Sequence, residues 1–410
     1  MNLLEDHAHR AWLEAEADRL LAFGRASRSA IGGFGWLDDD GATDPSHPVE
    51  LWISCRMTHS YALSVLRGNA ADRALVNHGV ASLRGALRDD ANGGWFASIG
   101  PDGPVNDAKE TYGHAFVILA ASSAAATGHP EAAALLDEAL AVFDEHFWDD
   151  EQGLAREAYA ADWSGLSDYR GVNANMHTVE AYLAAADVAA RPDLLERALR
   201  ITTRVVNEWA RNNQWRLPEH FTPEWEPLLE YNRDEPAHPF RPYGATIGHL
   251  LEWSRLTLQL EASLLRAGLD APRWMVGAAR ELYDAAVREG WNVDGAPGFV
   301  YTIDWNGVPV VRDRMHWVTA EAIGAALTLW LREGDEATAA DYEVWWNYAR
   351  EHHLDLVGGS WWHELAPDNT VGHSVWEGKP DIYHALQATL FPRLPITPSL
   401  ASALGAGLLQ

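Results

Sequence analysis

The sequence lacks the elements from which several classes of protein are built. Its 410 residues include a single cysteine, Cys55, which excludes an internal disulfide and a cysteine-based zinc site. No apolar run is long enough to span a bilayer, and the first 20 residues lack the basic start and apolar block of a signal peptide. We therefore expect a cytoplasmic protein without a membrane partner.

Basic residues are also scarce. The chain has 31 lysines and arginines against 59 acidic residues, and its formal net charge is −28. No basic stripe is available to neutralise phosphates, so nucleic acid is excluded as a partner. The H-E-x-x-H motif, a glycine-rich phosphate loop and a G-x-S-x-G elbow are absent as well. The sequence therefore indicates no metal and no cofactor.

What the chain does have is helical periodicity. Apolar residues recur at i, i+3, i+4 and i+7 in twelve windows, and no run alternates long enough for a central strand. The windows are residues 5–27, 50–68, 72–88, 108–127, 131–147, 171–190, 193–210, 244–267, 271–290, 314–333, 336–353 and 379–393. Long connections join the two helices of each pair, and short turns such as "GNAAD" join the pairs. The spacing predicts six helical hairpins with their long loops at one end.

Four of the long connections share a pattern of glycine beside aromatic residues: "GGFGWLDDDG", "GGWFASIGPDG", "GFVYTIDWNG" and "GGSWWHELAPDN". Two looser copies are "GLAREAYAADWSG" and "QWRLPEHFTPEW". A repeat of this kind predicts either a closed ring or an open superhelix of helix pairs. The apolar last helix, "IYHALQATLF", is unlike a polar capping repeat. We therefore expect an all-α protein with one domain over 1–410, a closed (α/α)6 barrel.

Polar residues gather at the beginnings of the second helix of each pair, which would line the cavity of such a barrel. They are Trp52, Arg56, His59, Tyr112, His114, Asn173, Asn175, His177, Arg241, His249, Glu252, His316, Trp317, Glu321, Asp381 and His384. Any one of the histidines is best read as a hydrogen-bonded core residue. Their repetition at the same helical depth favours a shared site instead.

Two of these positions carry specific chemical expectations. His249 and Glu252, at i and i+3, share a helix face, so the carboxylate could hold the imidazole in one tautomer for proton transfer. Arg56 lies among apolar neighbours, where an unpaired guanidinium is costly. It needs either an internal carboxylate or a ligand oxygen.

The motifs "RMTHSYALS", "NANMHTVEAYLA", "RPYGATIGHLLEW", "MHWVTAEAIGA" and "KPDIYHALQATLF" occur in this order over nearly the whole chain. With them the sequence resembles the N-acylglucosamine 2-epimerase superfamily. The resemblance implies an (α/α)6 barrel and proton transfer at C2 of a sugar, as an epimerase or an aldose–ketose isomerase. It implies no redox cofactor.

The resemblance also implies roles for individual residues. His249 and His384 are the expected acid/base pair, Arg56 the group that binds the oxygens at C1 and C2, and Glu252 the group that orients His249. The expected substrate-binding residues are Trp52, Tyr112, Asn173, His177, Arg241, Trp317 and Asp381. Which histidine takes the C2 proton stays open.

The likeness is greatest to the aldose–ketose isomerases of monosaccharides, a group with mannose and sulfoquinovose isomerases. At "EGKPDIYH" this chain has Lys379 where the sulfoquinovose enzymes tend to have glutamine. We therefore expect D-mannose and D-fructose as substrate and product, although Lys379 could serve an anion. The expected assembly is a monomer or a homodimer.

Other functions stay open. A 2-epimerase of the mannose/glucose or cellobiose type would use the same histidines as two opposed bases. Glycoside hydrolysis or lyase chemistry needs paired carboxylates, and the second helices offer more histidines than paired acids. A binding protein without catalytic activity would keep an aromatic cavity for a carbohydrate.

Overall fold

The computed structural model describes residues 3–410. These residues divide into two compact units. Of the described residues, the first unit comprises 3–20, Thr202–Lys379 and His384–Thr397, and the second comprises Leu21–Ile201, Pro380–Tyr383 and Pro398–Gln410. The expectation of a single domain stays a prediction. Within residues 3–410, none of the helices combines the length and the apolar character that crossing a bilayer requires.

Each of the twelve predicted windows contains a helix. The second unit holds α2 (Leu51–Leu66), α3 (Arg73–Leu83), α4 (Thr111–Ala126), α5 (Ala132–Val142), α6 (Val172–Ala189), most of α7 (Pro192–Thr202) and a helix that was not predicted, α13 (Leu400–Gly405). The first unit holds α8 (Ile247–Arg266), α9 (Trp274–Gly290), α10 (His316–Glu333) and α11 (Glu336–Tyr348). The helices α1 (His7–Gly24) and α12 (Tyr383–Leu390) contribute residues to both units.

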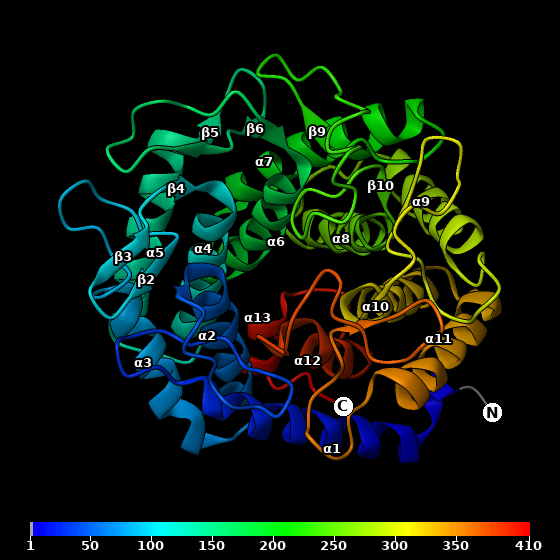
Figure 1. Cartoon of the computed structure of the whole chain (residues 1–410), viewed down its shortest axis with the longest axis horizontal. Coiled ribbons are helices and arrows are strands. Elements are labelled where there is room, and N and C mark those ends of the chain that lie inside the picture. The colour runs from blue at the N-terminus through cyan, green and yellow to red at the C-terminus, as the bar shows by residue number, and fades with distance from the viewer. Residues whose placement is uncertain (1–2) are drawn as a thin grey trace. The chain divides into compact units, whose positions relative to one another are not determined.

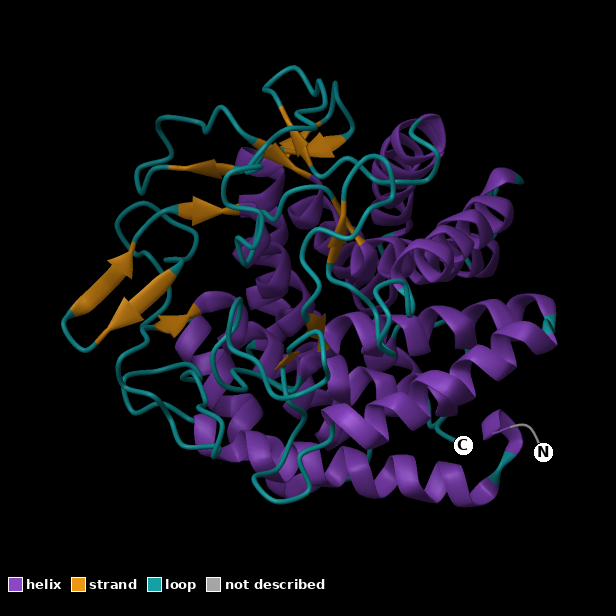
Figure 2. Cartoon of the chain, turned by 45° about the vertical axis from the view of Figure 1, so that its right-hand side comes forward, coloured by secondary structure: helices purple, strands orange, loops and turns teal. Residues whose placement is uncertain are grey.

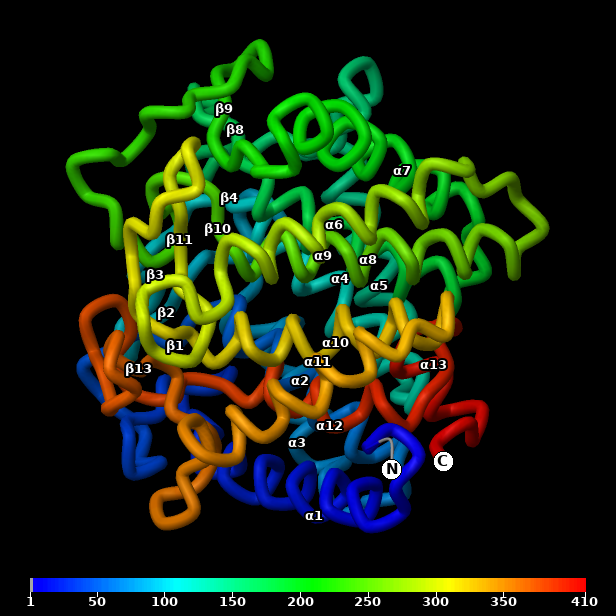
Figure 3. Tube along the Cα trace, turned by 90° about the vertical axis from the view of Figure 1, so that its right-hand side faces the viewer, coloured from blue at the N-terminus to red at the C-terminus, as the bar shows by residue number. Residues whose placement is uncertain are grey.

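Within each unit, helices pack both on the next helix of the chain and on the next helix but one. In the first unit α8 packs on α9 and on α10, and α10 packs on α11 (Figures 1 and 3). In the second unit α4 packs between α2 and α6. The outer helices α5, α7 and α11 continue as π-helical segments over Phe143–Phe147, Thr203–Ala210 and Ala349–His353.

The two helices of a pair differ in burial, as the sequence predicted. Every residue of α2 from Leu51 to Val65 is buried, although the helix carries Arg56 and His59. By contrast α5 buries one stripe only, at Ala132, Leu135, Leu136, Ala139 and Leu140. A helix that is enclosed on all sides must satisfy its polar side chains internally or with a ligand. The polar residues of the second helices are therefore candidates for function.

The strands are two to four residues long and lie in the connections (Figure 2). In the second unit they are β1 (Val49–Glu50), β2 (Ser98–Gly100), β3 (Gly103–Asn106), β4 (Lys109–Glu110), β5 (Trp148–Asp149), β6 (Leu154–Ala155), β7 (Ala158–Tyr159) and β8 (Arg170–Gly171). In the first unit they are β9 (His220–Phe221), β10 (Ala245–Thr246), β11 (Thr302–Ile303), β12 (Arg314–Met315) and β13 (Glu364–Leu365). The antiparallel pairs β1·β2, β4·β7, β10·β11 and β12·β13 each place one strand directly before a buried helix. These pairs fix where α2, α4, α8 and α10 begin.

The repeated connections share a backbone plan. A glycine occupies the left-handed region in the clearer copies, for example Gly94 and Gly307. The looser copy "QWRLPEHFTPEW" places Gln214, Trp215 and Trp225 in that region instead. Because side chains other than glycine enter it at some cost, this copy keeps the fold of the repeat without its glycine signal.

Candidate active site

The first unit brings the two predicted catalytic histidines to one aromatic ring. The ring of Trp317 lies 5.3 Å from that of His249 and 5.8 Å from that of His384, measured between centroids. Gly248 makes this arrangement possible, because a Cβ at that position would lie 2.2 Å from Cζ3 of Trp317. The half-buried Trp317 and the two histidines therefore form the centre of a candidate site.

His249 is held by a carboxylate that the sequence reasoning did not select. Its Nδ1 lies 2.9 Å from Oε1 of Glu219, which is buried in the connection before β9. An ionised carboxylate can only accept, so Nδ1 carries the proton and Nε2 the lone pair when the ring is neutral. The predicted hydrogen bond from Glu252 is therefore not the one that holds Nδ1; Glu219 takes that place.

Glu252 has its ion pair with an arginine. Oε1 of Glu252 lies 3.3 Å from Nη2 of Arg255, three residues further along α8. A charged guanidinium is a stronger partner for a carboxylate than a neutral imidazole at the same helical spacing. This preference explains why the i, i+3 pattern at His249 and Glu252 misidentified the group at Nδ1.

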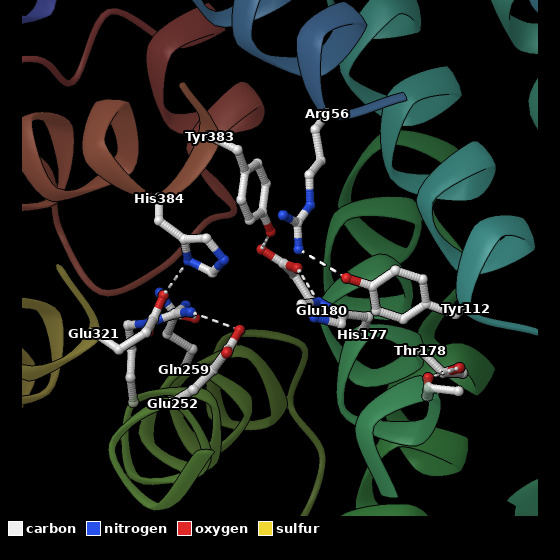
Figure 4. A network of polar contacts seen from close by, with 12 residues as sticks. Arg56, Tyr112, His177, Thr178, Glu180, Glu252, Gln259, Glu321, Tyr383 and His384 are labelled. Carbon is white, nitrogen blue, oxygen red and sulfur yellow. Dashed lines mark hydrogen bonds and ion pairs between the residues drawn. The ribbon is translucent and has the colours of Figure 1, made fainter. Parts of the chain in front are cut away.

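His384 has the same type of partner. Its Nδ1 lies 3.0 Å from Oε1 of Glu321 (Figure 4). Oε2 of Glu321 accepts a hydrogen bond of 2.8 Å from Nε of Arg255. Burial alone would raise the pKa of Glu321, but Arg255 and His384 outweigh it and hold the pKa below its usual value. Glu321 is therefore ionised and fixes the proton of neutral His384 on Nδ1.

The second unit contains the predicted oxygen-binding arginine. Arg56 donates from Nη1 to Oδ2 of Asp381 at 3.2 Å and from Nη2 to the hydroxyl of Tyr112 at 3.0 Å. Burial would lower the pKa of Arg56, whereas Tyr112, Asp381 and Tyr383 raise it above its usual value. Of the two partners that the sequence left open, an internal carboxylate or a ligand oxygen, the structure provides the carboxylate of Asp381, and the guanidinium stays charged.

Aromatic rings enclose this guanidinium. The centroids of Trp52, Phe116 and Tyr383 lie 5.0, 4.6 and 4.7 Å from Cζ of Arg56. Nε of Arg56 is buried and has no hydrogen-bond partner among residues 3–410. Such an unsatisfied donor costs about 1–3 kcal/mol. An oxygen from a ligand would relieve that cost.

His177 also pairs with a buried glutamate in the second unit. Its Nδ1 lies 3.2 Å from Oε2 of Glu180, and Glu180 Oε1 accepts a short hydrogen bond from the hydroxyl of Tyr383 (Figure 4). The ring of Tyr112 meets His177 edge-on at 5.3 Å. The sequence reasoning missed Glu180, although its H-x-x-E spacing to His177 is the signal that drew attention to His249 and Glu252.

Three predicted substrate-binding residues remain: Asn173, Arg241 and Asp381. Asn173 is half-buried in the first turn of α6, and Arg241 is half-buried in the connection before β10. Asp381 has a second task, because its Oδ1 accepts a hydrogen bond of 2.8 Å from the backbone N–H of Tyr383 and so caps α12. The structure leaves the roles of Asn173 and Arg241 as predictions.

Lys379 is not available to bind an anionic substituent. Its ammonium is fully buried, lies 2.6 Å from Oδ2 of Asp355, donates to the carbonyl of Gly359 at 3.0 Å and lies 3.8 Å from the ring of Trp362. The suggestion that it could serve an anion is therefore wrong. Lys109, in the corresponding connection of the second unit, forms the same type of pair with Asp89 at 2.7 Å.

The chain is similar to known proteins over nearly its whole length. The chain is 51% identical over 399 residues to a D-mannose isomerase of Thermobifida fusca, with 97% of each chain covered. It is 47% identical over 405 residues to a D-mannose isomerase of Pseudomonas cannabina pv. alisalensis, covering 99% of this chain and 97% of the relative. A crystal structure of D-mannose isomerase matches with a TM-score of 0.86 and 29% identity, covering 92% of this chain and 96% of the other.

These matches confirm the predicted fold class, an all-α (α/α)6 barrel. They also confirm the resemblance that the ordered motifs indicated. The family described as N-acylglucosamine 2-epimerase (GlcNAc 2-epimerase) matches residues 32–388, which include the motifs around Arg56, His177, His249 and His384. The chain belongs to this family.

Proposed function

We propose that this chain is an isomerase that interconverts D-mannose and D-fructose by proton transfer through a cis-enediol(ate). The observation that carries the proposal is the pair His249 and His384 beside Trp317, each with Nδ1 bonded to a buried glutamate. That geometry gives each neutral histidine a basic Nε2 and gives each imidazolium a counter-charge. The relatives named D-mannose isomerase support the choice of sugar.

In sum, the proposed reaction moves one hydrogen from C2 to C1 and one from the oxygen at C2 to the oxygen at C1, so that the open-chain aldose becomes the ketose. One histidine, as the imidazolium, opens the ring by protonating the ring oxygen from Nε2, while a base takes the proton from the anomeric hydroxyl and C1 becomes the aldehyde carbon. The base then takes the proton from C2 while an acid protonates the oxygen at C1, which gives the cis-enediol. The hydroxyl at C2 loses its proton as C1 gains one, and the product is the ketose. A single base can serve C2 and C1 because both lie on one face of the cis-enediol.

Arg56 has the proposed task of stabilising the oxygens at C1 and C2. The ion pair with Asp381 keeps Arg56 charged, and its buried Nε–H is a hydrogen-bond donor without a partner among residues 3–410. Electrostatic stabilisation of a developing oxyanion by fixed donors is a major contribution to catalysis of this type. Tyr112, Asn173, His177 and Arg241 are proposed to bind hydroxyls, with Trp52 and Trp317 packing against the sugar. We place the enzyme in the cytoplasm, as a monomer or homodimer.

The strongest competing substrate is a sulfonated monosaccharide. A sulfonate group needs a cation or several donors at its binding position. The lysine that could have filled this need is committed to Asp355. This observation favours mannose over sulfoquinovose.

Proton NMR of the protein with D-mannose in deuterated buffer containing EDTA tests the function. We expect fructose to form, with deuterium entering C1, and no glucose among the early products. Glucose as the main early product would instead establish a 2-epimerase with two opposed bases. If no isomerisation, epimerisation or exchange occurred while calorimetry detected mannose binding, the chain would be a binding protein.

Lys379→Met is expected to lower the free energy of unfolding. It should leave the ratio of kcat/KM for neutral and anionic sugars unchanged. Removing one partner of a buried ion pair costs about 3–5 kcal/mol of unfolding free energy, because the remaining carboxylate is left unpaired. Lys109→Met, which breaks the equivalent pair with Asp89, is the matched variant. Thermal unfolding of both proteins measures the loss. A changed ratio of kcat/KM for mannose and sulfoquinovose in Lys379→Met alone would contradict the structural role.

A further inference from the structure

A dehydrated charge cluster lies behind His384 in the first unit. Each nitrogen of the Arg255 guanidinium donates to a different side chain: Nε to Glu321 at 2.8 Å, Nη1 to Gln259 at 3.1 Å and Nη2 to Glu252 at 3.3 Å. The side chains of Arg255, Glu252 and Glu321 are no more than 2% exposed. The cluster therefore joins α8 to α10 and, through Glu321, to His384 on α12.

Phe391 and Gly324 pack closely around the Arg255 side chain. The ring of Phe391, which follows α12, lies 4.9 Å from Cζ of Arg255. On α10, Gly324 faces the side chain, and a Cβ there would lie 3.1 Å from Cδ of Arg255. A Cβ at 324 would therefore require the Arg255 side chain to shift by a few tenths of an ångström. The guanidinium is thus fixed by packing as well as by hydrogen bonds.

Stability alone does not account for such a cluster. Taking ions out of water costs several kcal/mol for each, and apolar side chains of similar volume often serve as well or better. Arg255 and His384 share Glu321, since Oε2 accepts from Arg255 and Oε1 lies beside Nδ1 of His384. The ionised Glu321 would supply the counter-charge when His384 becomes an imidazolium. The arrangement is therefore matched to a histidine that gains and loses a proton.

We propose that Arg255 is a positioning residue for the acid/base step, which holds Glu321 in the place where it receives the Nδ1–H of His384. The inference rests on the proposed isomerase function. In this role Arg255 touches no substrate. Its hydrogen bond to Oε2 of Glu321 keeps the other carboxylate oxygen, Oε1, directed at Nδ1 of His384. Its charge keeps Glu321 in the ionised form.

Two substitutions of Arg255 test the proposal. Arg255→Lys keeps the charge but cannot bond to all three partners, and Arg255→Gln removes the charge. Because a well-placed acid/base group contributes about 100- to 10,000-fold to the rate, we expect kcat to fall about 10-fold in the lysine variant and about 100-fold in the glutamine variant. KM should change less than threefold in either, roughly, since substrate contacts are retained.

Arg332 provides the matched control. It joins the same two helices through a bidentate pair with Glu261, at 2.8 Å from both Nε and Nη2, but one edge of that pair is exposed. Arg332→Gln should therefore lower the unfolding temperature without changing kcat. Equal losses of kcat in Arg332→Gln and Arg255→Gln would show that both arginines act through helix packing only, and would overturn the proposal.

Nitrogen NMR of ¹⁵N-histidine-labelled protein supplies a measurement that needs no substrate. With His384 assigned by comparison with His384→Asn, we expect Nδ1–H and an unprotonated Nε2 in the parent protein and a mixture of tautomers in the Arg255 variants. If Arg255→Gln does not fold, the His384 tautomer in Arg255→Lys tests the proposal. An unchanged tautomer in the Arg255 variants overturns the proposal for Arg255. If the tautomer changes in those variants but the parent protein does not isomerise mannose, the proposed function alone is contradicted.

Discussion

His249→Asn and His384→Asn are each expected to reduce kcat for mannose isomerisation by about 100-fold or more, the contribution of a positioned acid or base. The fold should survive in both variants, because the amide of asparagine can donate to Glu219 or Glu321 in place of Nδ1–H. Formation of fructose and uptake of deuterium are measured together by proton NMR. Wild-type turnover in both variants would exclude the two histidines as the acid/base pair.

His353 is a suitable control for these substitutions. It is fully buried, its Nε2 lies 3.1 Å from the hydroxyl of Thr319, and its Nδ1 lies 3.1 Å from the carbonyl of Trp362. Burial holds its pKa at about 3, so it stays neutral. His353→Asn should therefore lower the unfolding temperature and leave kcat of the folded protein close to the parent value.

The two histidine variants also separate the two proton transfers. A variant that still accelerates exchange between the anomers of mannose, but no longer incorporates deuterium into fructose, has lost the base that acts at C2. A variant with the opposite behaviour has lost the group that opens the ring. Following both signals in one sample assigns the histidines without any assumption about their order.

Helices were predictable from the sequence because burial is periodic. The α5 stripe of Ala132, Leu135, Leu136 and Ala139 repeats at the period of one face of a helix, and the mostly apolar sequence neighbours of Arg56 indicate an enclosed helix. The two-residue strands were not predictable, since alternation cannot be recognised over so short a run. Their positions depend on pairing between residues far apart in sequence, such as Glu50 with Ser98.

Sequence patterns do not separate the candidate catalytic histidines from the histidines of the core. His59 and His114 lie in the second helices of their pairs, as His177 and His249 do, so their sequence context is similar. His59 instead meets the hydroxyl of Ser123 at 2.7 Å, and burial lowers its pKa to about 4. His114 meets the carbonyl of Glu110 at 2.8 Å, and burial lowers its pKa to about 3. Only the tertiary structure distinguishes a histidine with a carboxylate at Nδ1 from a satisfied core residue.

The partner of His249 could not have been found by spacing. Glu219 is 30 residues away in sequence, in a connection whose glycine pattern is weak. Glu252 shares a helix face with His249, so local geometry pointed to it. The preference of Glu252 for Arg255 is an electrostatic effect that depends on a residue one helical turn further on.

Glu219→Gln is expected to have an effect close to that of removing His249 itself, with kcat lower by about 1,000-fold and KM nearly unchanged. A neutral amide offers no counter-charge to the imidazolium, and its nitrogen can donate to Nδ1, which moves the proton of the neutral ring to Nε2. The same change in the serine protease triad lowers kcat about 10,000-fold for this reason.

Glu252→Gln is the matched comparison for Glu219→Gln. It makes the same substitution, glutamate to glutamine, at the position that the i, i+3 spacing to His249 favours. It weakens the Arg255 cluster but leaves the Glu219 carboxylate at Nδ1, so kcat should fall by less than in Glu219→Gln. Steady-state kinetics together with the ¹⁵N tautomer of His249 measures both effects. If Glu252→Gln changed the His249 tautomer and Glu219→Gln did not, the orienting role would return to Glu252. The expected order instead follows from charge, since a carboxylate already paired with a guanidinium has less of its negative potential left to stabilise a second cation.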